Sequence, residues 1–433
     1  MNNTDRSSTA ALSRRTFLKV GAGTAAVAAA APLLAACGSS GSGGGGGSSK
    51  TVKLGVITTW LTPPIKKIIS DFEASSGQHV EIVPIPGSSG VQLIQQFTPG
   101  FVAGKPSVDV MFISDEATPG FVAAGWLEPL DDILKPIQSD FPGYINAYHD
   151  QWNVKDGHSY RITAQWSVCL YFTQQQALSQ LGAKTPTSWD DIDALATEAK
   201  NKGLWAFADA VEKPALAFVD AAWLTMQAGG DVFDFGDATA AAFQFVKNLI
   251  DKGAFPKEAI GWTYDQSNAA YTQNKILTMR QWNYFTDVAA AAKPWYTPAK
   301  ATVSLPPAGP NGKAATWGGG WGLAVPAKAG NVDGAKQFVS YMLASSRSTE
   351  VATASANWAV PRKSNESLAK TNALFAAMQK YGDAGVMQPR PFRTKINDAQ
   401  AVVDDVFTGY LSGQQSLSAA MKDGSSRIQA LGS

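Results

Sequence analysis

The stretch from Ser13 to Cys37 constrains the rest of the chain most, because it decides where the protein folds and works. It contains a basic pair, Arg14-Arg15, then a run of glycine, alanine and valine, then small residues before Cys37. A basic start, a short apolar core and small residues before a cut are the parts of an export signal. The run is interrupted by Pro32 and is too short to span a bilayer. The sequence therefore predicts a domain that works outside the cytoplasm.

Two details of this signal predict how the protein is exported and held. The segment Arg14 to Leu18 resembles the twin-arginine signals, which are read by a receptor and serve proteins exported already folded. The segment Leu34 to Cys37 resembles a bacterial lipobox, in which the cysteine is lipidated and becomes the first mature residue; the alternative is an ordinary secretory signal. Gly38 to Ser49 contains only glycine and serine, which is the composition of a flexible tether. We expect a signal peptide over residues 1–36 and a tether over residues 37–49, anchored by lipid at the extracytoplasmic face of the bacterial cell membrane.

The net charge of the mature chain does not indicate a nucleic-acid-binding protein. Residues 1–36 hold four of the 36 basic and one of the 35 acidic residues, which leaves 32 against 34. About 397 remaining residues exceed what one core usually serves, so two domains are expected. With Cys37 assigned to lipid, Cys169 has no partner for a disulfide. It lies in the apolar run Val168 to Phe172, which predicts a buried thiol.

The hydrophobic pattern predicts an α/β fold. Strands are expected over residues 50–59 and 80–86, with a helix between them whose apolar face is Ile65, Ile68, Ile69 and Phe72. This alternation is how a parallel sheet begins. Further along, Ser188 and Asp191 predict the capping box of a helix. Helices are also expected from Asp237 to near Gly253 and over residues 336–343, 398–411 and 419–431, and a short strand over residues 302–305.

Motifs spread along the chain occur in an order that is typical of one family. They are Asp109-Val110 with an acidic residue past the strand end, Phe121 to Asp131, Thr185 to Ile192, Gly229-Gly230, Gln273 to Met279, Gly319 to Val325 and Trp358 to Arg362. In these motifs the chain resembles the solute-binding proteins of bacterial ABC importers that take up sugars, of the maltose-binding-protein type, and the resemblance covers nearly all of residues 50–433. Two departures, Phe172-Thr173 where the family often has Tyr-Asn and Asn274 where it has glycine, fall on scaffold positions.

The resemblance implies a two-lobed periplasmic-binding-protein fold of type II, in which each lobe is a mainly parallel sheet flanked by helices. It implies lobe 1 over residues 50–163 and 307–345, and lobe 2 over residues 166–303 and 348–433. A hinge of two or three segments would cross near residues 161–167, 304–307 and 343–347. It further implies a monomer without cofactor, metal or catalytic residues, which binds a small solute and delivers it to the transmembrane subunits of an ABC permease.

Thirteen tryptophans suggest an aromatic binding site, although core packing is the alternative for each. A sugar ring has one face of C–H bonds and a rim of hydroxyls, so its site combines an aromatic plate with polar groups. Open α/β sheets bind ligands beyond the carboxyl ends of their strands. This criterion selects Trp60, Trp166, Trp282 and Trp321; the resemblance adds Trp223 and Trp358, and Trp126, Trp189 and Trp205 are assigned to the core.

For the polar rim, Asp115 and Glu116 follow the third predicted strand, where the family places an acidic ligand-binding residue; helix capping is their alternative. The backbone of Gly318 to Gly320 has no side chains and could approach a hydroxyl closely at Gly319; a β-bulge is the alternative. Position alone adds Gln165, Asp220, Asn283 and Arg393, the last of which could equally be a surface charge.

Enzyme motifs are missing from the sequence. It contains no Gly-x-Ser-x-Gly, His-Glu-x-x-His, Cys-x-x-Cys or Walker loop. The three histidines, His79, His149 and His158, do not cluster, and we expect each to be solvated or to cap a helix. Three alternatives remain: a non-sugar solute such as a polyamine or glycerol phosphate, a binding protein that feeds a sensor, and a secreted glycoside hydrolase that uses two carboxylates.

Overall fold

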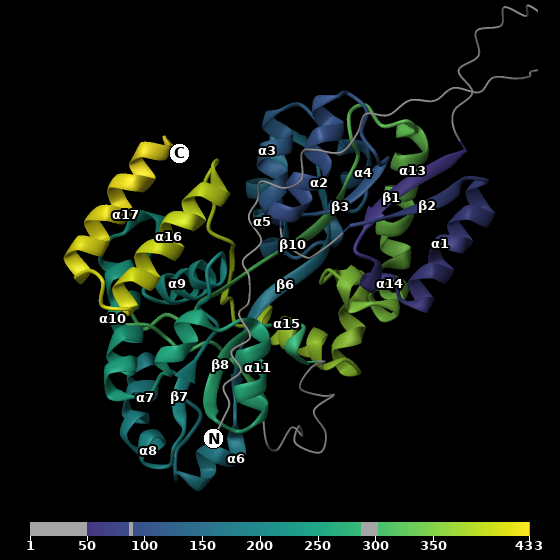
Figure 1. The fold of residues 1–433 in the computed structure, drawn as a ribbon. Helices are drawn as coiled ribbons and strands as arrows, with labels where there is room; N and C mark the ends of the chain where they lie inside the picture. The colour runs from purple at the N-terminus through teal and green to yellow at the C-terminus, as the bar shows by residue number, and fades with distance from the viewer. Residues whose placement is uncertain (1–49, 86–89, 287–301, 433) are drawn as a thin grey trace, which may run out of the picture. The chain divides into compact units, whose positions relative to one another are not determined.

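A computed structural model describes residues 50–85, 90–286 and 302–432 of the chain (Figure 1). The predicted signal peptide and tether, with Arg14, Arg15 and Cys37, lie outside the described residues. Within the described residues, every helix is too short or too polar to cross a membrane.

The described strands form a mixed nine-stranded sheet and a separate hairpin. The order along the large sheet is β2-β1-β3-β10-β6-β8-β7, with β11 paired to β10 and β9 paired to β6. The strands are β1 (Thr51–Val56), β2 (His79–Pro84), β3 (Val110–Ser114), β6 (Ile162–Thr173), β7 (Trp205–Ala208), β8 (Ile276–Trp282), β9 (Thr302–Ser304), β10 (Thr316–Ala324) and β11 (Met387–Pro389), and the hairpin is β4 (Val154–Lys155) with β5 (His158–Ser159).

Two long strands, β6 and β10, connect the two ends of this sheet (Figure 1). β6 pairs antiparallel with β10 through residues 162–168 and with β8 and β9 through residues 169–173. β10 in turn pairs antiparallel with β3. The pairs further out, β1 with β2 and with β3, and β7 with β8, are parallel. Parallel pairs built from strand–helix–strand units therefore flank a central antiparallel crossing.

The N-terminal unit follows the predicted pattern. Helix α1 buries the expected face of Ile65, Ile68, Ile69 and Phe72, and the Thr62 hydroxyl caps it by accepting a hydrogen bond from the backbone N–H of Ile65. Of the other α-helices described in this part of the chain, one lies between β2 and β3 and three lie between β3 and β4. The helices are α1 (Pro63–Ser76), α2 (Gly90–Val102), α3 (Thr118–Ala123), α4 (Asp131–Leu134) and α5 (Gly143–Asn153), with the short 3-10 helices η1 (Thr58–Trp60), η2 (Asp115–Ala117) and η3 (Gln138–Asp140).

The middle of the chain confirms the predicted capping box. The Ser188 hydroxyl accepts from the N–H of Asp191, whose carboxylate accepts from the N–H of Ser188 in return. Trp189 is buried and stacks on Phe245 with ring centroids 4.5 Å apart, as its assignment to the core requires. The helices here are α6 (Gln175–Gln180), α7 (Trp189–Ala194), α8 (Ala196–Asn201), α9 (Leu216–Gln227), α10 (Asp237–Lys252) and α11 (Tyr264–Thr272), with η4 (Val232–Asp234) and η5 (Lys257–Gly261).

The C-terminal helices contact both the N-terminal part and the middle part of the chain. The Thr62 hydroxyl, at the start of α1, donates to the carbonyl of Ala354 in α14 at 2.9 Å, whereas α16 packs on α9 and α17. The proposed division into lobes remains a prediction. These helices are α13 (Val332–Leu343), α14 (Ser348–Ala354), α15 (Ala373–Asp383), α16 (Ile396–Leu411) and α17 (Leu417–Leu431), with η6 (Ser345–Arg347), η7 (Ala356–Trp358) and η8 (Lys363–Lys370).

The predictions for Cys169 and His149 have different outcomes. Cys169 is buried as expected, and burial raises the pKa of its thiol to about 12. The prediction for His149 is wrong: its side chain is 1% exposed and its two ring nitrogens contact Ser159 and Asn153. The other two histidines, His79 and His158, are exposed as expected and pair with Glu73 and Asp131.

Candidate ligand site

Three of the six predicted tryptophans meet in one cluster at the carboxyl ends of β1 and β3. Trp60 contacts Trp321 edge to face, with centroids 4.8 Å apart. Phe112 stacks on Trp358 at 4.5 Å, and the Trp358 indole N–H donates to the carbonyl of Trp60. Trp358 and Phe112 are buried, while Trp60 and Trp321 keep exposed surface. The cluster therefore presents two partly exposed indoles on a packed aromatic base, as the predicted aromatic plate would.

The other three predicted tryptophans lie elsewhere. Trp166 and Trp223 are fully buried, and the Trp223 indole N–H donates to the Thr316 hydroxyl at 3.0 Å. Trp282 is half-buried, contacts Trp317 edge to face and donates to the hydroxyl of Tyr264. Trp166 and Trp223 therefore pack in the core, which is the alternative given for each tryptophan in the sequence analysis.

The predicted acidic pair is held by a residue that sequence reasoning did not select, Arg390. One guanidinium nitrogen lies 2.8 Å from Asp115 Oδ1, and another bonds Glu116 Oε1. The guanidinium also lies over the rings of Trp317, at 5.2 Å, and Trp152, at 5.7 Å. Burial alone would lower the pKa of Arg390, but Asp115 and then Glu116 outweigh it and raise that pKa. A buried cation therefore binds both carboxylates at once.

Asp115 is fully engaged by the protein, and Glu116 is not. Asp115 is 2% exposed and accepts hydrogen bonds from the hydroxyl of Tyr148, at 3.0 Å, and the N–H of Gly320, at 3.1 Å, besides Arg390. Only Glu116 keeps exposed surface, with 19% of its side chain accessible. We therefore expect Glu116, and not Asp115, to reach a ligand.

The remaining predicted rim residues divide between this site and the scaffold. Gln165 lies at the site, since its side-chain amide oxygen accepts from the backbone N–H of Trp321 at 3.3 Å. The Asn283 side chain accepts from the backbone of Val168, which is a structural bond. Arg393 pairs with Asp231, the N-cap of η4, at 2.8 Å and with Asp234, the last residue of η4, at 3.0 Å, and so fits the surface-charge alternative.

Asp220 belongs to a different, fully buried cluster. It lies in α9 near Asp209, which follows β7 and pairs with Arg280 of β8. Burial first and Asp209 second raise the pKa of Asp220 well above its ordinary value. The neutral form of Asp220 is therefore favoured, and this cluster is sealed from solvent.

The glycine run of β10 brings its backbone against these polar groups. A Cβ on Gly319 would lie 2.3 Å from Asp115 Oδ2, and one on Gly320 would lie 2.0 Å from the carbonyl oxygen of Gln165. Real Cβ atoms do not approach other heavy atoms this closely. The absence of side chains is therefore required for packing, independently of any contact with a ligand.

We expect Gly319→Ala to lower the free energy of unfolding by about 1–3 kcal/mol, because Asp115 and Arg390 would have to move. Urea unfolding followed by tryptophan fluorescence measures this loss. Gly120→Ala is the matched control, since nothing lies within 4 Å of a Cβ on this residue of α3. Equal stability of the two variants would contradict the crowding described for Gly319.

A cavity of about 390 Å³ opens beside Glu116. Its walls come from two distant parts of the sequence, and the amide of Asn397 donates to the carbonyl of Glu116 at 3.4 Å across them. Trp126, assigned to the core from sequence, is half-buried and lines this cavity while stacking on Phe101. The lining residues are Ile94, Thr98, Glu116, Ala117, Gly120, Phe121 and Trp126 on one side and Thr394, Lys395, Ile396, Asn397 and Asp398 on the other.

Residues 58–346 match the family of bacterial extracellular solute-binding proteins. The chain belongs to this family. Solved structures share its fold along 88% of the chain, so the predicted type II binding-protein fold is confirmed. They include maltose-bound MalE3 of T. maritima (19% identity, 99% of that chain covered, TM-score 0.73), the GacH receptor of Streptomyces glaucescens, solved unliganded and with acarbose (19%, 98%, 0.73), and a solute-binding protein of Thermotoga lettingae bound with α-D-tagatose (19%, 99%, 0.71).

Proposed function

We propose that this solute-binding protein captures a mono- or oligosaccharide and delivers it to the permease of an ABC importer. The observation that carries the proposal is the pair of partly exposed indoles, Trp60 and Trp321. Trp321 pairs across the sheet with Ser114, two residues before Glu116, and Glu116 lines the cavity. An indole face packs against the C–H face of a sugar, while a carboxylate and an amide bond its hydroxyls. The sugars bound by the relatives, maltose, acarbose and tagatose, support the same ligand class.

The capture mechanism that we propose is closure of two lobes on the ligand. The cavity beside Glu116 is lined by residues 94–126, which belong to the proposed lobe 1, and residues 394–398, which belong to the proposed lobe 2. A ligand that touches both walls only in the closed form shifts the population toward that form. Small-angle scattering should then show compaction when the ligand is added, and a bound ligand without compaction would refute closure.

The Trp60–Trp321 pair gives a direct test of the sugar site. A carbohydrate library screened by thermal shift should contain a ligand that raises the melting temperature, and calorimetry then gives its affinity. We expect Trp321→Ala to weaken this affinity by about tenfold, since one aromatic contact contributes about 1 kcal/mol beyond its buried area. The control is Trp205→Ala, which removes a half-buried indole that packs on Trp262. A library without a binder, or equal affinities in the two variants, would contradict the proposal.

We also propose that the chain works at the membrane surface through lipid on Cys37, and that it leaves its ligand chemically intact. Mass spectrometry of the membrane fraction should find the acyl chains on Cys37, and Cys37→Ser should release the protein.

Incubation with oligosaccharides should give no shorter products. Cleavage would favour the glycoside hydrolase alternative.

A further inference from the structure

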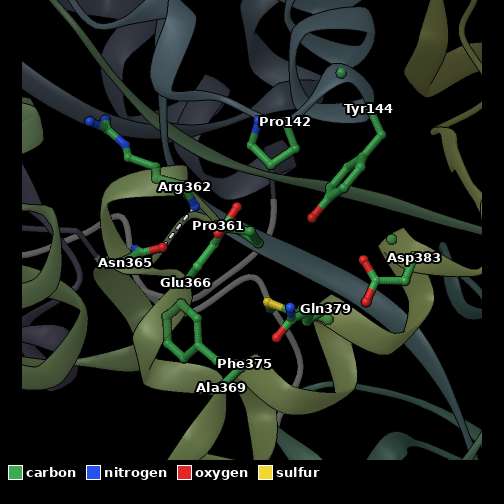
Figure 2. Close-up of a pocket in the computed structure, with 13 residues that line it drawn as sticks. Pro142, Tyr144, Pro361, Arg362, Asn365, Glu366, Ala369, Phe375, Gln379 and Asp383 are labelled. Atoms are coloured by element: carbon green, nitrogen blue, oxygen red, sulfur yellow. Dashed lines mark hydrogen bonds between the residues drawn. The ribbon is translucent and has the colours of Figure 1, made fainter.

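A second cavity, of about 290 Å³, shares no residue with the candidate ligand site (Figure 2). It lies between the start of α5, residues 361–369 and helix α15. Its volume is slightly below the about 300 Å³ at which pockets for drug-sized ligands begin, so its ligand must be small. The lining comprises Pro142, Gly143, Tyr144, Pro361, Arg362, Asn365, Glu366, Ala369, Phe375, Met378, Gln379, Gly382 and Asp383.

The floor of this cavity is apolar. Pro361, Phe375 and Met378 are buried and line it. The ring of Tyr144 forms a side wall directly over Gly382, where a Cβ would lie 3.2 Å from Cε1 of the ring. A short alkyl chain would pack on this floor and lose contact with water.

The opening of the cavity is surrounded by negatively charged carboxylates and by other oxygen atoms that can accept hydrogen bonds. The carboxylates of Glu366 and Asp383 and the hydroxyl of Tyr144 point toward the same space, with the amide of Gln379 below them (Figure 2). Neither carboxylate forms an ion pair with a residue that the structure describes. Burial first and Asp383 second raise the pKa of Tyr144, so its hydroxyl remains protonated and neutral.

The one cation in the lining is turned away from the opening. The guanidinium of Arg362 points out of the cavity in Figure 2 and donates to the carbonyl of Leu343 at 2.7 Å. It also lies 3.6 Å from Asp140 and 4.6 Å from the ring centroid of Phe141. Because Arg362 is engaged on that side, it forms no ion pair with the two carboxylates of the opening, which have no ion-pair partner among the described residues.

We propose that this cavity binds a small primary alkylamine. The ammonium group has three donors and would lie between Glu366 and Asp383, with the hydroxyl oxygen of Tyr144 or the amide oxygen of Gln379 as a further acceptor. The alkyl stem would pack on Phe375 and Met378. Anions are disfavoured here by the same two carboxylates, and larger solutes by the volume. The proposal is independent of which sugar the first site takes.

n-Butylammonium chloride is the probe, and n-butanol is its uncharged counterpart. Titration of the full-length mature protein at pH 7, followed by NMR of the Met378 methyl group, should show saturable binding of the amine. The double variant Glu366→Gln/Asp383→Asn should weaken it by about tenfold, as expected for the loss of two partly exposed charge contacts. Glu258→Gln, which removes an exposed carboxylate of η5 elsewhere, is the matched control and should bind as the unaltered protein does.

Two further variants separate this cavity from other sites. Ala369→Phe should fill the cavity and remove amine binding while leaving sugar binding intact. Trp321→Ala should leave amine binding unchanged, which excludes an amine held in the first site. Equal binding of n-butanol, unchanged affinity in the double carboxylate variant, or absence of any saturable shift would overturn the proposal.

Discussion

Acidification from pH 7.5 to pH 5 is expected to lower the free energy of unfolding by about 2 kcal/mol through His149 alone. Burial first and Arg161 second lower the pKa of His149 from 6.5 to about 3. The unfolded chain therefore binds a proton below pH 6.5 that the folded protein excludes. The stability is fully present above pH 6.5 and is lost as the pH falls toward 3.

The network around His149 explains why the neutral ring is retained. Its Nε2 lies 3.0 Å from the Ser159 hydroxyl and its Nδ1 lies 3.0 Å from the Asn153 amide, whose carbonyl oxygen accepts from Arg161. Asp131, which acts in the opposite direction on the pKa, is the weaker influence. A proton on this ring would face a buried guanidinium without a carboxylate in contact.

His149→Gln isolates this contribution, because glutamine keeps polar atoms at the position but does not titrate. Urea unfolding at pH 7.5 and pH 5 should show a smaller loss for the variant than for the unaltered protein, by about 2 kcal/mol. Carboxylates elsewhere contribute equally to both proteins and cancel in the comparison. The same pH dependence in both would show that His149 is protonated in the folded state.

Features that depend on short stretches of sequence could be predicted. The apolar face of α1 repeats at helical spacing, and the Ser188–Asp191 capping box closes within one turn, so both follow from local geometry. Cys169 lies within the apolar run Val168 to Phe172 of β6, which is enough to predict its burial. The family motifs then predicted the type II fold along nearly all of the chain.

Side-chain environments that depend on distant segments could not be predicted. Trp166 and Trp321 both lie next to turn-forming or small residues in long strands, yet only Trp321 keeps exposed surface. Which side of β6 and β10 is covered depends on helices from other parts of the chain. The sequence favours Arg393 over Arg390 as a rim residue, because the partners of Arg390, Asp115 and Glu116, lie about 275 residues away in sequence. The burial of His149 arises closer in sequence, where its ring contacts Asn153 of α5 and Ser159 of β5.

Removal of Arg390 is expected to cost about 3–5 kcal/mol of stability, since a buried carboxylate would be left without its counter-charge. Arg390→Met keeps most of the apolar stem against Trp152 and Trp317 and removes only the charged group. Chemical unfolding at pH 7 measures the loss. The control is Arg427→Met, whose exposed pairs with Asp405 and Asp423 should contribute less than about 1 kcal/mol.

A double-mutant cycle shows whether the loss arises from the Asp115 charge. Adding Asp115→Asn to Arg390→Met should recover about 1 kcal/mol or more relative to the sum of the single changes, because the neutral amide no longer requires a cation. Glu116 keeps exposed surface and should respond less to the same treatment. Purely additive losses would show that Arg390 acts through packing alone. Coupling confined to Asp115 would instead leave Glu116 as the carboxylate available to a bound solute, which is the role that we assign to it at the candidate ligand site.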